Sequence, residues 1–217
     1  MTDPAPSESQ VYVVEDDDSV CRSLWRLLTA NGYAVQCHDS AESMLTTLPA
    51  NSAGCALVDV RLPNMDGVQL QALLAAHSPS LGVVLLTGYA DVGTAVSVMK
   101  NGAVDYLIKP ISEEALLPVV REALRRSART QMRLAAEQRV TDTLALLTRR
   151  EREVMEHVVG GRLNKQIAAE LGIAEKTVKV HRSRVMAKMG VRSVAELARR
   201  CQALGIAGPH LPEERPV

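Results

Sequence analysis

Short apolar runs alternate with helical patterns through the first half of the chain. We interpret the runs as five strands: VYVV at 11–14, YAVQC at 33–37, CALVD at 55–59, LGVVLL at 81–86 and DYLI at 105–108. Apolar positions at helical spacing predict helices between them, at 19–31, 41–48, 68–77 and 91–101. The central runs are apolar throughout, which is typical of parallel strands covered on both faces. The pattern predicts an α/β fold with a doubly wound, five-stranded parallel sheet.

The second half of the chain shows helical patterns alone. Ser112 is the predicted N-cap of a helix that begins at Glu113. Neither Gly nor Pro occurs from 119 to 159, so we expect this helix to continue into a helical linker. Pro118 should kink the helix or delay its regular start. Glycine-containing loops then separate an all-α, four-helix domain with helices at 149–159, 164–171, 175–189 and 194–204.

These patterns divide the chain into five segments. Small polar residues and prolines predict a disordered tail at 1–9, and a Pro-rich stretch predicts a flexible tail at 207–217. Between the tails we place the α/β domain at 10–124, the helical linker at 125–146 and the four-helix domain at 147–206.

Charge separates the two halves of the chain. Residues 1–124 hold 6 basic and 15 acidic side chains, whereas residues 125–217 hold 19 and 10, so net charges of −9 and +9 cancel. An acidic half attracts a divalent cation, and a basic half attracts a polyanion such as nucleic acid. We interpret the charge of the linker as that of a solvated helix face rather than as a specific contact with DNA or a partner.

The sequence gives no sign of a membrane segment or of a disulfide framework. No apolar run approaches the roughly 18 residues that span a bilayer, and the first ten residues lack the pattern of a signal peptide. We therefore expect a cytoplasmic protein without membrane contact. The cysteines form no CxxC pair, which favours buried free thiols over disulfides or a structural metal; they are Cys21, Cys37, Cys55 and Cys201.

Polar residues follow four of the predicted strands, at the edge where open parallel sheets bind ligands. A single Asp in such a place is more often a helix cap, and we interpret Asp18 with Ser19 as the cap of the first helix. Co-occurrence at four strand ends indicates instead a site for a hard cation, Mg²⁺, with one carboxylate left to attack. The strand-end residues are Glu15, Asp16, Asp17, Asp59, Thr87 and Lys109.

Residues 10–124 resemble the receiver domains of two-component response regulators, which have a flavodoxin-like fold. The resemblance rests on VVEDD, LVDVRLPNMDG, VVLLTGYAD and AVDYLIKP. It implies that Asp59 is the phosphoacceptor and attacks a phosphohistidine on a sensor histidine kinase. It also implies that Mg²⁺ is the cofactor, held by Glu15, Asp16, Asp59 and the backbone carbonyl of Arg61.

The same resemblance implies a switch. Lys109 would pair with the phosphoryl oxygens, Thr87 would hydrogen-bond to them, and Tyr106 would fill the space behind Thr87. From the strand pattern alone, we would interpret Tyr106 as a half-buried aromatic side chain of a strand. Glu15 stands where many receivers have Asp, so we expect its contact with Mg²⁺ to pass through water. The resemblance also implies a cis peptide before Pro110.

The predicted helix at 175–189 has two distinct faces. At about 100° per residue, Val178, His181, Val185 and Met189 share one face, which should pack on the core. The other is short, polar and basic, as a helix that enters a DNA groove requires. The candidate contacts to bases and phosphates are Lys165, Lys176, Thr177, Lys179, Val180, Arg182, Ser183, Arg184 and Lys188.

Residues 147–205 resemble the LuxR-type helix-turn-helix of FixJ- and NarL-like regulators. The matching segments are LTRREREVMEHVVGG, NKQIAAELGIAEKTVKVHRSRVMAKMG and VRSVAELAR. We expect Asn164 to cap the second helix of this domain. Ala174 stands where relatives often have Ser or Thr, so the recognition helix lacks a good cap, for which Glu175 partly compensates.

Together these features predict a response regulator transcription factor rather than an enzyme. We expect its partners to be a sensor histidine kinase, double-stranded DNA, a second copy on phosphorylation, and RNA polymerase. A flavodoxin-like phosphatase or nucleotide-binding protein is the first alternative, but EDDDSV after the first strand has no glycine cradle for phosphates. The second alternative is a DNA-binding protein with a vestigial receiver.

Overall fold

The computed structural model describes residues 9–89, 92–203 and 206, and they belong to two compact units, Met1–Met132 and Arg133–Val217. Except for Ser9, the tails predicted at 1–9 and 207–217 lie outside the described residues.

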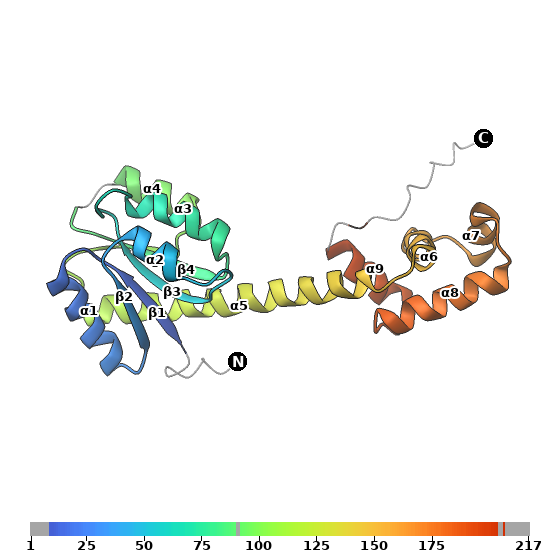
Figure 1. The fold of residues 1–217 in the computed structure, drawn as a ribbon, viewed down its shortest axis with the longest axis horizontal. Coiled ribbons are helices and arrows are strands. Elements are labelled where there is room, and N and C mark those ends of the chain that lie inside the picture. The colour runs from blue at the N-terminus through green and yellow to red at the C-terminus, as the bar shows by residue number, and fades with distance from the viewer. Residues whose placement is uncertain (1–8, 90–91, 204–205, 207–217) are drawn as a thin grey trace. The chain divides into compact units, whose positions relative to one another are not determined.

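A parallel sheet of five strands forms the centre of the first unit (Figure 1). The strands lie in the order β2-β1-β3-β4-β5, and every pair is parallel. Because β1 and β3 are adjacent, the chain reverses direction across the sheet there, as the predicted doubly wound fold requires. The strands are β1 Gln10–Val14, β2 Ala34–His38, β3 Gly54–Asp59, β4 Leu81–Thr87 and β5 Asp105–Ile108.

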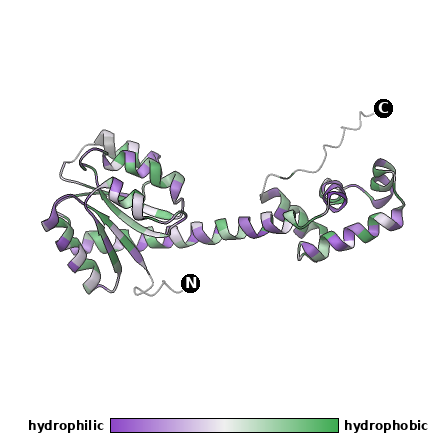
Figure 2. Ribbon diagram, in the orientation of Figure 1, coloured by the Kyte–Doolittle hydropathy of each residue, from purple (hydrophilic) through white to green (hydrophobic). Residues whose placement is uncertain are grey.

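Helices cover both faces of this sheet, and each face has its own apolar core. One core holds Val14 and Val58 with side chains of α2, α3 and α4, and the other holds Val13 and Leu86 with side chains of α1 and α5. The central strands β3 and β4 are buried at every position, in accord with their apolar colour in Figure 2. The helices are α1 Asp18–Ala30, α2 Ala41–Thr47, α3 Gly67–His77, α4 Val92–Lys100 and α5 Glu113–Ala145.

The start of α1 differs from the prediction. The N-cap is Asp17, whose side chain accepts hydrogen bonds from the backbone N–H groups of Ser19 (2.7 Å) and Val20 (3.3 Å). Asp18 and Ser19, the predicted cap, already lie in the first turn. The cap belongs to Asp17 because its backbone is still extended, which lets its carboxylate reach the free amides of the helix.

Helix α5 is continuous from Glu113 to Ala145. The backbone N–H of Ala115 donates to Ser112 Oγ at 3.3 Å, so the predicted cap is confirmed. Pro118 lies inside the helix and does not delay its start.

Two small residues let α5 approach the sheet closely. Ser127 Oγ is buried and accepts a hydrogen bond from the backbone N–H of Gly54 at 2.7 Å. A Cβ atom at Gly82 would lie 2.7 Å from the backbone oxygen of Ala123, so only glycine fits there. The contacts of α5 with the sheet thus extend to Ser127, three residues past the predicted domain end at 124.

The second unit packs four helices and the end of α5 around one core. Val154, Ile167, Val178 and Leu197 are fully buried in it. The helices are α6 Arg149–Val159, α7 Asn164–Leu171, α8 Glu175–Lys188 and α9 Val194–Ala203. Among the described residues, no helix is both long and apolar enough to cross a membrane.

The prediction that Asn164 caps α7 is wrong. The N-cap position belongs to Leu163, whose backbone N–H donates to the side chain of Gln166 at 2.8 Å. Asn164 Oδ1 instead accepts a hydrogen bond from Arg182 on α8, at 3.1 Å. Ala174 is the N-cap of α8 and makes no side-chain cap, as its sequence predicts.

Candidate functional site

The carboxyl ends of β1, β3, β4 and β5 bring the predicted acidic site together. These four strands are adjacent and parallel, so residues that follow them meet at one edge of the sheet. Glu15, Asp59 and Thr87 are each no more than 5% exposed, whereas Asp16 is exposed. Lys109 follows β5 and precedes a cis peptide bond to Pro110, as the resemblance implies.

Lys109 pairs with two buried carboxylates. Its Nζ lies 2.5 Å from Glu15 Oε2 and 2.7 Å from Asp59 Oδ1. Burial would lower the pKa of Lys109, but hydrogen bonds to Asp59 and Glu15 outweigh it and raise the pKa. Burial also raises the pKa of Glu15, against the opposing hydrogen bond from Lys109. One cation therefore faces two desolvated acids, which leaves the site short of positive charge.

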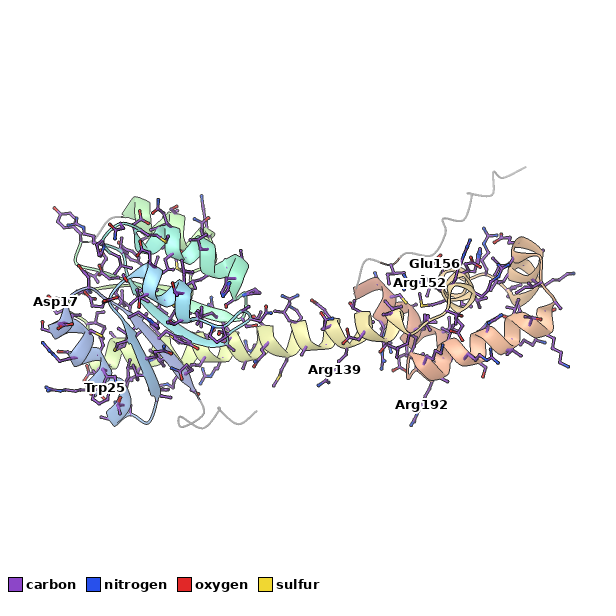
Figure 3. The ribbon with its side chains drawn as sticks, viewed as in Figure 1. Asp17, Trp25, Arg139, Arg152, Glu156 and Arg192 are labelled. Carbon is purple, nitrogen blue, oxygen red and sulfur yellow. The ribbon has the colours of Figure 1, made fainter. Side chains whose placement is uncertain are left out.

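The acidic residues fit a divalent cation. Glu15, Asp16 and Asp59 each offer a carboxylate oxygen, and these atoms all lie within 4.8 Å of one another. Hard oxygen ligands suit Mg²⁺. The site is open to solvent at Asp16, and Mg²⁺ keeps several waters when it is bound. Asp17, the other acid predicted to follow β1, is bound to the start of α1 instead (Figure 3).

The loop after β3 folds back over Asp59. The backbone N–H of Arg61 donates to Asp59 Oδ2 at 2.8 Å, which orients the carboxylate. Gly67 N–H donates to Val60 O at 3.0 Å, and a Cβ atom at Gly67 would lie 2.2 Å from Asp59 O. Gly67 is not among the residues predicted from the sequence, but glycine is required there because its backbone passes against the strand end. The DG pair at 66–67 was the available signal.

Thr87 and Tyr106 are linked through one backbone group. Thr87 Oγ1 donates to Tyr89 O at 3.2 Å and accepts from Tyr89 N–H at 3.2 Å, while Tyr106 Oη donates to Tyr89 O at 3.3 Å. The Tyr89 side chain is 69% exposed, and the guanidinium of Arg61 lies 5.8 Å from its ring centroid. The segment after β4 is thereby tied to β5.

Helix α8 has the two faces expected from its sequence. Val178, Val185 and Met189 are buried, and His181 is partly buried beside them. The opposite face is exposed, and Val180 is 43% exposed. Among the predicted DNA contacts, the exposed polar residues are Lys165, Lys176, Thr177, Lys179, Ser183, Arg184 and Lys188, and Arg182 is partly exposed.

The basic side chains near α8 differ in what they contact. Lys179 Nζ lies 3.4 Å from Glu175 in an exposed pair, so it is free to turn towards a ligand. Arg182 donates to Asn164, and Lys188 Nζ pairs with buried Glu151 at 2.7 Å. Arg182 and Lys188 are therefore engaged within the domain.

Two family models match the chain. The response regulator receiver domain matches residues 11–121, and the luxR family of bacterial regulatory proteins matches residues 145–201. One match lies in each unit.

Similar full-length proteins and structures are known. The transcriptional regulatory protein FixJ of Azorhizobium caulinodans is 41% identical over 93% of this chain and 96% of the relative. Nodulation protein W of Bradyrhizobium diazoefficiens is 40% identical over 95% and 91%. Among solved structures, response regulator StyR is 38% identical with a TM-score of 0.79, covering 89% of this chain and 98% of that one. Full-length FixJ from B. japonicum is 37% identical with a TM-score of 0.56, covering 92% and 98%.

Proposed function

The chain belongs to the response regulators that join a receiver domain to a LuxR-type DNA-binding domain, and on this premise we propose that Asp59 phosphorylation controls its DNA binding. Proteins of this family regulate transcription and are not metabolic enzymes. The observation that carries the proposal is the buried Asp59 carboxylate, held by Lys109 and Arg61 N–H beside Glu15 and Asp16.

In the proposed reaction, a carboxylate oxygen of Asp59 attacks the phosphorus of a phosphohistidine on a sensor kinase. The P–N bond breaks, its electron pair returns to the imidazole, and an acyl phosphate forms on Asp59. Lys109, which pairs with Asp59, would neutralise the transferred oxygens after its ammonium leaves the carboxylate. Bound at Glu15, Asp16 and Asp59, Mg²⁺ would supply the remaining positive charge.

The phosphoryl group then competes for Thr87. Its charge near −2 makes it a stronger acceptor than a backbone carbonyl, so the Thr87 hydroxyl would leave Tyr89 O. Tyr106 shares that carbonyl and would move into the space behind Thr87. This changes the surface formed by α4 and β5, through which we propose that two copies associate.

The DNA-binding part of the proposal uses the exposed face of α8. Lys179 would donate to guanine and Val180 would contact a thymine methyl group in the major groove. Lys165 and Arg184 would bind phosphates. A dimer would occupy two half-sites and contact RNA polymerase from there, which makes inverted or repeated sites the expected operators.

The first test is labelling of Asp59. The full-length protein is incubated with acetyl phosphate and MgCl₂, and the acyl phosphate is located by mass spectrometry. We expect a label on the wild type and on Asp18→Asn, an exposed acid on α1, and none on Asp59→Asn. Label that persists in Asp59→Asn would place the acceptor elsewhere.

The second test separates this function from that of a vestigial receiver. A duplex is first selected from a random-sequence library by the wild-type protein. Beryllofluoride with Mg²⁺ should then raise both the affinity for this duplex and the fraction of dimer in solution. An unchanged affinity and oligomeric state would favour a DNA-binding protein that ignores its receiver.

A further inference from the structure

Lys188, at the C-terminal end of α8, joins three helix ends. Its Nζ donates to Glu151 Oε2 at 2.7 Å and to the backbone carbonyl of Leu146, just past the end of α5, at 3.0 Å. Glu151 is 2% exposed and also forms a capping box with Thr148 at the start of α6. The end of the recognition helix is thereby bound to the end of α5 and to the beginning of α6.

A second cation reaches the same end of α5. Arg152 of α6 (Figure 3) donates from Nη2 to Leu144 O at 3.1 Å. The last carbonyls of a helix lack partners within it and carry the negative end of its dipole, so cations bind them favourably. Of these two cations, Lys188 belongs to α8 and Arg152 to α6, so the hydrogen bonds of Lys188 link the end of α5 to the recognition helix.

The other end of α5 packs on the strand that carries Thr87. Leu116 and Val120 of α5 share a core with Val84 and Leu86 of β4, and Leu86 directly precedes Thr87. The same helix, α5, thus contributes to the core of the first unit and ends just before the carbonyl that Lys188 binds. The groups at both ends of α5 are packed or hydrogen-bonded, and energetic coupling between distant sites requires such contacts.

We propose that Lys188 is a positioning residue through which the C-terminal end of α5 sets the placement of the recognition helix, and not a DNA phosphate contact. The inference rests on the proposed function. The side chain is 34% exposed, and its ammonium already has two acceptors. Turning it towards DNA would leave Glu151, whose side chain is 3% exposed, as an unpaired buried charge.

The test compares two properties of full-length variants on the selected duplex: the gain in affinity on acetyl phosphate treatment and the slope of log K against log salt. Allosteric gains are typically about 5- to 150-fold, and we expect Lys188→Gln to reduce the gain to about 2-fold or less. Its salt slope should stay at the wild-type value. Lys188→Arg, which keeps the charge and the donors, should restore the gain.

Two control variants distinguish the proposed role of Lys188 from a DNA phosphate contact and from a route through α6. Lys165→Ala removes an exposed lysine of the same domain, and should keep the gain while lowering the salt slope by about one. Arg152→Gln removes the bond from α6 to α5 without touching α8, and should keep most of the gain. Equal losses in Arg152→Gln and Lys188→Gln would overturn the role of Lys188, because the route would then pass through α6.

Further outcomes distinguish a failure of the Lys188 inference from a failure of the proposed function. A kept gain with a reduced salt slope in Lys188→Gln would make Lys188 a phosphate contact and overturn the inference alone. Absence of a gain in the labelled wild type would contradict the proposed function instead. If Lys188→Gln does not fold, amide exchange in the wild type serves: phosphorylation should alter protection at 144–151 and 184–189 together, and unchanged protection there would overturn the inference.

Discussion

The hydroxyl groups of Thr87 and Tyr106 donate to the same acceptor, the backbone carbonyl of Tyr89, at 3.2 and 3.3 Å. A residue at the end of β4 is thus tied to one on β5 through this shared acceptor. Any acceptor that draws the Thr87 hydroxyl away breaks one of the two hydrogen bonds to the Tyr89 carbonyl. We therefore propose that this pair responds to phosphorylation of Asp59.

The first prediction concerns Thr87. Thr87→Ala removes the hydroxyl but leaves Asp59 and Lys109 in place, so acetyl phosphate should still label the protein. The gain in DNA affinity on labelling should be lost, because nothing draws the Tyr89 segment inward. Labelling by mass spectrometry and binding by fluorescence anisotropy check both parts. Thr87→Ser, which keeps the hydroxyl, should behave as the wild type; a full gain in Thr87→Ala would exclude the switch.

The second prediction concerns the metal. Mg²⁺ at ten times its dissociation constant should raise the free energy of unfolding of the receiver by about 1.4 kcal/mol, because it binds the folded state alone. Asp16→Asn should remove most of this effect, since Asp16 is an exposed member of the acidic cluster. Urea unfolding with and without MgCl₂, followed through the single tryptophan, Trp25, measures it. Asp18→Asn is the matched control, and equal Mg²⁺ responses in both variants would argue against the cluster.

The third prediction concerns the attachment of α5 to the sheet. Ser127→Ala leaves the buried N–H of Gly54 without its acceptor, which should lower the free energy of unfolding of the receiver by about 1–3 kcal/mol. Urea unfolding followed by Trp25 fluorescence provides the measurement. Ser97→Ala, an exposed serine on α4, should change it by less than about 0.5 kcal/mol. Equal stability of the two variants would mean that the buried bond contributes nothing.

The fourth prediction concerns acid stability of the DNA-binding domain. The hydrogen bond from Lys188, with that from Thr148 N–H, lowers the pKa of Glu151 from 4.5 to about 2. The lowered pKa stabilises the fold above pH 4.5, and this contribution is lost as the pH falls towards 2. Glu151→Gln should therefore melt below the wild type at neutral pH, with a gap that closes across this window in circular dichroism melts. A gap independent of pH would mean that the charge of Glu151 is not the cause.

The fifth prediction concerns DNA recognition. Lys179→Ala should weaken binding to the selected duplex by about 1–3 kcal/mol and relax specificity, because the substitution removes the donor of the proposed base contact. Lys165→Ala should weaken binding to all sequences and lower the salt slope by about one. Anisotropy titrations on the selected and a shuffled duplex distinguish the two. Unchanged affinities in both variants would exclude this face of α8 and α7.

Much of the fold follows from local patterns that a sequence displays directly. Short apolar runs predicted all five strands, and the glycines at 32 and 102, with φ of 86° and 92°, predicted where α1 and α4 end. The helix caps were harder. Asp17, Asp18 and Ser19 are all good cap residues, and only the backbone angles decide which of them has the extended conformation.

For the candidate site, too, the sequence and the tertiary structure determine different features. The sequence determined the chemical groups: acids after β1 and β3, a hydroxyl after β4, an amine after β5, and a basic exposed helix face. Tertiary structure decided how these groups are used, because contacts between distant residues depend on packing that no local pattern encodes. It paired Lys109 with Glu15 and Asp59, required Gly67 for a close backbone approach, and paired Lys188 with a buried carboxylate 37 residues away in sequence.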